Sequence, residues 1–373
     1  MILVQKWIDK IPWKLILGLI IVSGVILVGV MHDDGLYQQP IMQVQSVTEG
    51  KPSKTNDEFQ NADTQTNQTL KGVVLNGKYR GHRLTITNTY STSQTMDHRY
   101  RVGEKAFVVI HPSEDFRATI QDYKRDVPIT FLVLLAVCLL LVFLKLSGLT
   151  ALLSIGINTI LFYIAVMLNG HSQGTQVLLV FSILTVVFSV VTLILILGFT
   201  RQMMVTLAST LLGTLASILL ALVVFALTHE RGVYYESMQY VTQLPRPLFL
   251  AETMIGSLGA VMDESTDIVS SLFALKRERP DLSRLQIFKS GQQIGKSIMG
   301  PLLNVLFFIF MGETIPMALL FLKNGNTWGY SFSMNMSLGM VQSLISGIGI
   351  VLAIPLASGL TALWIDRKRS EVK

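Results

Sequence analysis

The sequence predicts an all-α polytopic membrane bundle of about eight transmembrane helices, with a small β-rich domain inserted after the first helix. Hydrophobic residues make up 50% of the 373 residues and charged residues only 14%, against about 25% charged residues in soluble globular proteins. Apolar runs of about 20 residues recur along the chain, each long enough to cross a bilayer. Residues 32–126 interrupt this pattern with short β-like runs. The lipid bilayer is therefore an expected partner.

The first apolar run, residues 13–31, follows Lys6 and Lys10. Signal peptides share this basic start, but the run is long for one and lacks a clear small-residue cleavage site. We therefore expect residues 1–31 to form a cytoplasmic N-terminus and a retained first transmembrane helix.

Residues 32–126 are expected to form a small extracytoplasmic β-barrel or sandwich. Alternating or β-branched runs predict strands at 41–47, 70–76, 82–88 and 105–110. Gly77 and Gly81 bracket a hairpin turn, and Gly103 precedes the fourth run. The stretch 50–68 is rich in Thr, Asn, Asp and Gln, which predicts a loop or disordered insert.

The other apolar runs follow one another closely, so that residues 127–373 are expected to form one transmembrane helical domain. We place the crossings at 127–146, 148–168, 175–198, 203–228, 249–274, 298–322 and 337–364. Within 203–228, Ser209, Gly213 and Ser217 recur every four residues. Small residues at this spacing favour close helix packing over a ligand site.

Basic residues predict the orientation of the chain. Residues 32–126 hold 12 acidic and 12 basic residues, so the whole net charge of +6 lies in the remainder. With the N-terminus inside, the inner segments carry 15 Lys and Arg residues and the short outer loops carry three. The positive-inside rule then places both termini in the cytoplasm and residues 32–126 outside, in a multi-pass protein of the cell membrane. Because the excess charge follows membrane orientation, no nucleic-acid partner is expected.

Cofactor chemistry is not expected. Cys138 is the only cysteine, and none of the six histidines has zinc-like spacing to another. No Gly-rich phosphate loop of the Walker form occurs. An intramembrane acid dyad of Asp263 and Glu313 is conceivable, but Glu313 is expected nearer the outer face. We therefore expect neither a bound metal nor an enzyme.

The stretch 249–275 is the principal candidate site because it is long enough to cross the bilayer yet carries four acids. Carboxylates are costly in hydrocarbon, about 2.5–3.5 kcal/mol each, so an intramembrane acid indicates function. At about 100° per residue, Asp263 lies roughly 20° and Asp267 roughly 60° around the helix from Glu252, whereas Glu264 lies about 120° away from the stripe. The same stripe holds four small or hydroxylic residues: Gly256, Gly259, Thr266 and Ser270. This pattern predicts a helix that faces a polar cavity or a closely packed partner.

The next segments add polar residues. Residues 276–296 are basic and predict a short amphipathic helix on the cytoplasmic leaflet, with Asp281 or Ser283 as N-cap after Pro280. The crossing 298–322 contains Asn304 and Glu313, and Pro316 frees the carbonyl of Gly312. A broken helix at membrane depth needs water or other polar groups nearby.

Two blocks resemble the YibE/F family of bacterial membrane proteins. The first is a GxxGAxMD pattern, formed by Gly256, Gly259, Ala260, Met262 and Asp263. The second is formed by Ile294, Gly295, Met299, Gly300 and Asn304. The resemblance implies an extracytoplasmic β-rich segment after the first span, followed by a helical membrane domain.

A second likeness is local. The order of an acidic helix, a basic amphipathic connector and a further helix is similar to the proton-relay core of RND exporters and the SecDF export factor. It implies a relay role for Asp263, with Glu264 or Asp267 as the second acid. The large periplasmic domains of those exporters are missing from this chain.

Two functions stay open at this stage. In an ion- or proton-coupled transporter, Asp263 would exchange a proton with Asp267 and Glu252 as neighbours, and the substrate is not specified by the sequence. In a non-transporting scaffold, the outer β domain would bind a partner, and the acids would be satisfied by Thr266, Ser270, Asn304 or another subunit. Both hypotheses allow a homo-oligomer or a related membrane subunit.

Overall fold

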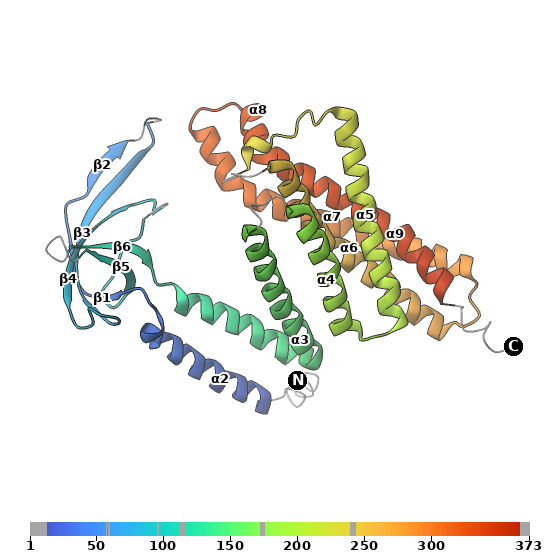
Figure 1. The fold of residues 1–373 in the computed structure, drawn as a ribbon, viewed down its shortest axis with the longest axis horizontal. Helices are drawn as coiled ribbons and strands as arrows, with labels where there is room; N and C mark the ends of the chain where they lie inside the picture. The colour runs from blue at the N-terminus through green and yellow to red at the C-terminus, as the bar shows by residue number, and fades with distance from the viewer. Residues whose placement is uncertain are drawn as a thin grey trace, which may run out of the picture. The chain divides into compact units, whose positions relative to one another are not determined.

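The computed structural model describes residues 13–56, 58, 60–94, 97–111, 117–171, 176–238 and 244–365. The chain forms two compact units, residues 1–148 and 149–373, and Figure 1 shows the elements of each. The basic residues Lys6, Lys10, Arg367, Lys368, Arg369 and Lys373, which enter the orientation argument, lie outside the described residues.

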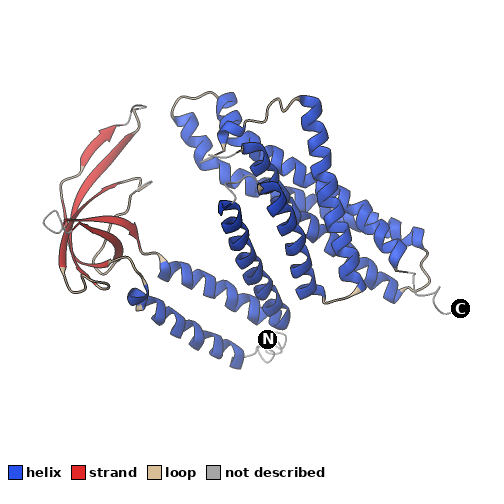
Figure 2. Cartoon of the chain, viewed as in Figure 1, coloured by secondary structure: helices blue, strands red, loops and turns tan. Residues whose placement is uncertain are grey.

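Unit 1 contains two long helical segments and the β-strands, which Figure 2 distinguishes by colour. Its helices are α2 (Trp13–Met31), the short 3-10 helix η1 (Asp33–Leu36) and the beginning of α3 (Asp126–His171). Its strands are β1 (Ile41–Glu49), β2 (Ser53–Asn56), β3 (Ala62–Val74), β4 (Arg83–Ser91), β5 (Lys105–His111) and β6 (Arg117–Tyr123). The four predicted strands are confirmed as β1, β3, β4 and β5.

The described strands form one antiparallel sheet with the curvature of a half-barrel. β3 pairs with β4 and β1, β1 pairs with β5, and β5 pairs with β6. The register shifts between Val44 and Ser46 and again between Phe107 and Val108, and bulges of this kind bend a strand. The concave side is filled by nine buried residues: Met42, Val44, Leu70, Val74, Leu84, Ile86, Tyr100, Ala106 and Val108.

The expectation of a loop or disordered insert at 50–68 is wrong where the structure describes these residues. β2 lies there, and β3 already begins at Ala62. The pairing runs from Ser53 opposite Gln65 to Asn56 opposite Ala62. These polar strands are stabilised by ladder hydrogen bonds and by β-branched Thr side chains, neither of which requires an apolar face.

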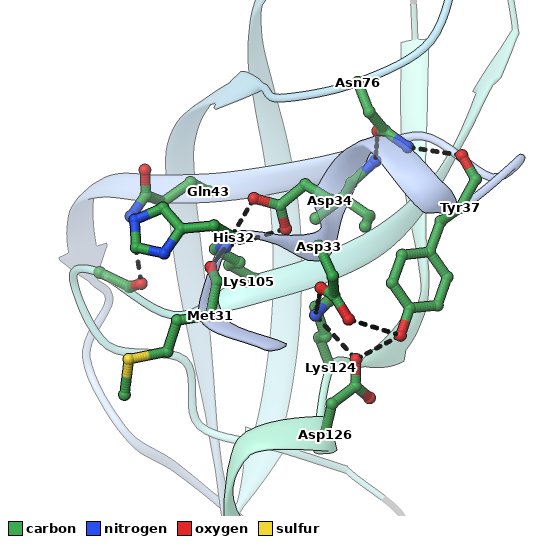
Figure 3. Close-up of polar contacts among 12 residues, drawn as sticks. Met31, His32, Asp33, Asp34, Tyr37, Gln43, Asn76, Lys105, Lys124 and Asp126 are labelled. Carbon is green, nitrogen blue, oxygen red and sulfur yellow. Dashed lines mark hydrogen bonds and ion pairs between the residues drawn. The ribbon is translucent and has the colours of Figure 1, made fainter. Parts of the chain in front are cut away.

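Figure 3 shows the junction at which both helices of unit 1 leave the β-sheet. Lys124 has a side chain only 3% exposed, and its Nζ lies 2.7 Å from a carboxylate oxygen of Asp33 and 2.7 Å from one of Asp126. The hydroxyl of Tyr37 donates to Asp126 Oδ2 at 2.6 Å. Lys105 Nζ donates to the Met31 carbonyl at 2.6 Å and lies 2.6 Å from Asp34. The end of α2 and the start of α3 are therefore both fixed to the β domain by buried or partly buried charge pairs.

Unit 2 is helical, and every predicted span coincides with a helix. Besides the rest of α3, its helical elements are α4 (Val177–Leu197), α5 (Arg201–Thr228), η2 (Tyr235–Ser237), α6 (Pro245–Glu278), α7 (Arg284–Lys323), α8 (Trp328–Ser331), the π-helical turn η3 (Phe332–Met336) and α9 (Ser337–Trp364). α3 is interrupted by Lys145 at φ 50°, which separates the predicted spans 127–146 and 148–168.

The core of unit 2 is the packing of α6 against α5 and α9. Val261 of α6 inserts between two glycines, where added Cβ atoms would lie 2.9 Å from it at Gly213 and 2.7 Å at Gly349. Ser209 and Ser217, on the same ridge of α5 as Gly213, are fully buried. The small residues thus let three helices approach closely, which confirms the packing prediction for this ridge.

Two predictions about α7 are wrong. Residues 284–296 are not a separate connector helix but the first turns of α7, which begins with a capping box between Ser283 and Gln286. The helix then continues through both Pro301 and Pro316 to Lys323. A proline removes one hydrogen bond but need not end a helix that is held by its neighbours, so the expected break at 312–316 is absent from the described backbone.

Six of the described helices are long and apolar enough to cross a membrane: α2, α3, α4, α5, α7, and the continuous segment from Trp328 to Trp364 that contains α9. α6 is long enough but is not among them because it carries the acids. The predicted long apolar helices and the N-terminal β domain are therefore confirmed, and they are consistent with the predicted multi-pass membrane protein.

Candidate functional site

A cavity of about 690 Å³ in unit 2 is lined by two carboxylates from different helices. Glu252 comes from α6 and Glu313 from α7. The other polar residues at its wall are Ser237, Thr314, Asn335 and Gln342. The apolar part of the wall includes four aromatic rings: Phe162, Phe181, Phe249 and Phe310. The cavity lies at the end of unit 2 where α6 and α9 begin and α7 ends.

Local backbone features shape this cavity. The π-helical turn η3 presents Asn335, whose Nδ2 donates to the Thr314 carbonyl of α7 at 3.1 Å; such turns occur frequently at functional sites. Gly256 lets the Gln342 amide approach α6, since a Cβ there would lie 2.8 Å from Nε2. Gly339 similarly leaves room for the ring of Phe310, since a Cβ at this position would lie 2.6 Å from the ring. Two notches thus bring polar and aromatic groups to one wall.

Glu264 is the acid that α6 buries completely. Its exposed fraction is 0%, and neither carboxylate oxygen has a hydrogen-bond partner among the described residues. The contact of Val261 with Gly213 and the hydrogen bond from Gln202 Nε2 to Ser270 Oγ, 2.8 Å long, fix the register of α5 and α6. A buried acid without a partner is costly unless it is protonated or hydrated, which makes Glu264 a candidate proton carrier.

The predicted stripe of α6 does not lie in the bundle interior throughout. Gly256 and Glu252 line the cavity and are exposed there, and Gly259, Asp263 and Asp267 are exposed elsewhere along the helix. Glu264 is indeed on another face, and that face is the buried one. The apolar side chains decide which face of α6 is buried, because Val261, Ile268 and Leu272 must be removed from solvent.

The other predicted polar residues are dispersed. Thr266 Oγ1 donates to the Met262 carbonyl of its own helix at 2.7 Å, and Ser270 is the partner of Gln202. Asn304 is exposed on α7.

The predicted packing positions also differ from one another. At Gly295 of α7, a Cβ would lie 2.6 Å from Ile354 of α9, so this glycine permits a close helix contact. Gly259, Gly300 and Gly312 have no atom within 4 Å of such a position. Pro316 is exposed within α7.

Asn335, Gln342 and the four phenylalanines were not predicted as site residues. Gln342 carried a usable signal, since a polar side chain inside an apolar span is itself an indication of function. The π-helical turn and the approach of four rings depend on tertiary packing and carry no such local signal. Among the described residues, no group of three His, Cys, Asp or Glu side chains is placed to hold a metal ion.

Comparison with known families accounts for most of the chain. Residues 132–367 match the model of the YibE/F-like protein, and residues 35–123 match that of the YibE/F family N-terminal domain. Neither a curated protein nor a solved structure matches the chain. The first match covers α6, with its acids, and the second covers the half-barrel. The chain therefore belongs to the YibE/F family.

Proposed function

We propose that this protein is an ion- or proton-coupled membrane transporter that uses the carboxylates of α6 and α7. The observation that carries the proposal is the cavity of unit 2 whose wall contains both Glu252 of α6 and Glu313 of α7. Acids at membrane depth are costly and characterise ion pathways. A cavity of this size between helices is also the usual position of a ligand site in a helical bundle.

The acids extend from this cavity along α6. At about 1.5 Å per residue, Asp263 lies about 16 Å and Asp267 about 22 Å along the axis from Glu252. Glu264 lies at the same level as Asp263 on the buried face. Because a proton passes between carboxylates by way of water or a hydroxyl group, this ladder supports a relay from the cavity toward the other end of α6.

We further propose about eight crossings, with α3 contributing two on either side of Lys145 and α6 contributing one. In this arrangement both termini are cytoplasmic and residues 32–126 are extracytoplasmic. The basic residues Lys276 and Arg277 in the last turn of α6 and Arg284 at the start of α7 support this orientation. The cavity then opens toward the outer half of the membrane. No catalytic role is proposed for the acids.

Flux measurements test the transport proposal. Purified protein in liposomes that enclose a pH-sensitive dye is given an inward proton gradient. We expect Glu252→Gln and Glu313→Gln each to reduce protein-dependent proton flux at least tenfold. Asp281→Asn, an exposed loop residue paired with Arg279, should leave the flux unchanged. Wild-type flux in the Glu252→Gln/Glu313→Gln double variant would exclude the acid relay.

The same assay separates two candidates for the inner part of the relay. Asp263→Asn should abolish coupled flux if the family-motif aspartate carries the proton, whereas Glu264→Gln should do so if the buried acid does. Loss of flux in only one variant assigns the proton-carrying role to the residue replaced in it. Wild-type flux in both variants would confine the relay to the acids of the cavity.

A second candidate function is a scaffold that presents the β domain to a partner. The observation in its favour is the junction of Lys124 and Lys105, which fixes the half-barrel to two helices. Removal of residues 35–125 should abolish function if the protein is a scaffold and should only modulate flux if it is a transporter.

A further inference from the structure

The cavity of unit 2 has the composition of a site for a positively charged ligand. Its wall includes two acids, Glu252 and Glu313, and the described lining contains no Lys, Arg or His. Neither acid forms an ion pair with a described residue. No described basic residue at this wall therefore balances the two acids.

The apolar part of the wall also favours a cation. Phe162 and Phe181 lie with ring centroids 6.3 Å apart, and Phe249 and Phe310 complete the aromatic lining. The face of an aromatic ring attracts an ammonium group, most strongly where water is excluded. A bare inorganic ion gains little from phenyl rings, whereas an organic cation uses both the carboxylates and the rings.

The size of the cavity points in the same direction. Its volume of about 690 Å³ falls within the range of about 300–1,000 Å³ found for small-molecule sites. The Asn335 amide donates to the Thr314 carbonyl, and the Gln342 amide packs beside Gly256. These contacts restrict the polar part of the wall and leave a mainly apolar volume beside two acids.

We propose that this cavity binds an organic cation, a protonated amine or quaternary ammonium group attached to an apolar body. The inference rests on the proposed transport function in that it names the substrate class of the same cavity. Glu252 and Glu313 supply the charge, and the phenyl rings enclose the apolar body and the ammonium methyl or methylene groups.

A pair of probes of equal shape tests this proposal. Benzyltrimethylammonium and its neutral isostere neopentylbenzene are titrated into the purified full-length chain in detergent, and binding is measured calorimetrically. We expect the cation to bind at least tenfold more tightly than the isostere. Glu252→Gln and Glu313→Gln should each weaken cation binding at least tenfold without changing the weak binding of the isostere. Asp281→Asn is the matched control and should bind both probes as wild type does.

A second measurement leaves both acids intact. In a Cys138→Ala background, Ser237→Cys places a thiol at the cavity wall, and benzyltrimethylammonium should slow its reaction with a maleimide while neopentylbenzene does not. Equal protection by both probes, or equal binding of both by wild type, would overturn the inference.

The proton-flux assay without a probe keeps the two proposals distinguishable. Cation-selective binding without proton flux would retain this inference and overturn coupled transport. Proton flux without cation-selective binding would retain coupled transport and overturn the organic-cation site.

Discussion

At the scale of single residues, two buried ionisable side chains differ in whether they have partners. Lys124 represents the first case, with two carboxylates at 2.7 Å, and Glu264 the second. Burial opposes the charge of Lys124, but its hydrogen bonds and ion pairs with Asp126 and Asp33 outweigh burial and raise its pKa above the usual value. Lys124 therefore stabilises the junction of unit 1, whereas Glu264 is an acid without a hydrogen-bond partner in the core of unit 2.

Replacing Lys124 by Met should strongly destabilise unit 1. The substitution leaves Asp33 and Asp126 close together without their shared cation, and breaking a buried pair costs about 3–5 kcal/mol. Chemical denaturation of the full-length protein in detergent, followed by proteolysis within residues 35–123, measures the effect. Lys54→Met, at an exposed position of β2, is the control and should change little; equal stability of the two variants would contradict the proposed role of the junction.

Tyr37 should make the stability of this junction decrease at alkaline pH. Its hydrogen bond to Asp126, followed by burial, raises the pKa of Tyr37 from 10.0 to about 12. A raised folded-state pKa favours the neutral phenol, so the stabilisation is complete below pH 10 and is lost as the pH rises toward 12. The stability difference between wild type and Tyr37→Phe should therefore be constant from pH 7 to 9 and shrink above pH 10. Burial also raises the pKa of Tyr100, so ultraviolet absorbance should show one late-ionising tyrosine fewer in Tyr37→Phe than in wild type. Identical titration curves would contradict the assignment.

At the scale of elements, α6 has two faces with different roles. The face around Val261, Glu264 and Ile268 is buried against its neighbours, and its closeness depends on glycines of α5 and α9. The face of Asp263 and Asp267 is exposed within this chain. Exposed acids on a membrane helix require a polar partner or water, so this face is the place to look for a second copy or a related subunit.

Gly349→Ala should destabilise the α6–α9 contact by about 1–3 kcal/mol, the usual cost of overpacking a core. The added methyl group would lie 2.7 Å from Val261 Cγ2 and 3.3 Å from Ser217 Oγ. Gly259→Ala is matched to it, because no atom lies within 4 Å of that Cβ position, and it should be neutral or stabilising by up to about 1 kcal/mol. Thermal unfolding in detergent compares the two; an unchanged midpoint for Gly349→Ala would show that α9 can move away.

At the scale of the whole molecule, the two matched regions of the YibE/F family differ in what stabilises them. The half-barrel is stabilised by strand pairing around its own core, and the helical unit by small-residue contacts among α5, α6, α7 and α9. α2 and the first half of α3 are apolar on all sides and bury little within this chain, which is typical of helices that face lipid.

Cysteine labelling tests the proposed orientation of these units. In a Cys138→Ala background, Thr89→Cys on the exposed side of β4 should react with a membrane-impermeant maleimide on intact cells. Arg279→Cys, exposed between α6 and α7, should react only after permeabilisation. The opposite result would invert the orientation, and labelling of both positions on intact cells would exclude α6 as a single crossing.

Much of the architecture was predictable because its determinants are local. Each predicted span coincides with a helix or with part of a longer one, and Gly77 and Gly81 do take positive φ values at the β3–β4 turn. The failures share a physical cause. The strands of 53–56 and 62–68 depend on pairing with each other and with β1 and β4, and α7 is supported through its prolines by α9.

The sequence by itself determined the helical membrane class, the order of the spans, the inserted β domain and the presence of four acids in 249–275, since hydropathy and residue period are carried by neighbouring residues. Only the tertiary structure decided what those acids face. Burial of Val261, Ile268 and Leu272 against α5 and α9 turns Glu264 into the core and Asp263 away from it. The approach of α7, η3 and α9 adds Glu313, Asn335 and Gln342, respectively, to Glu252. A helical wheel shows which residues share a face, but the neighbouring helices choose which face is buried.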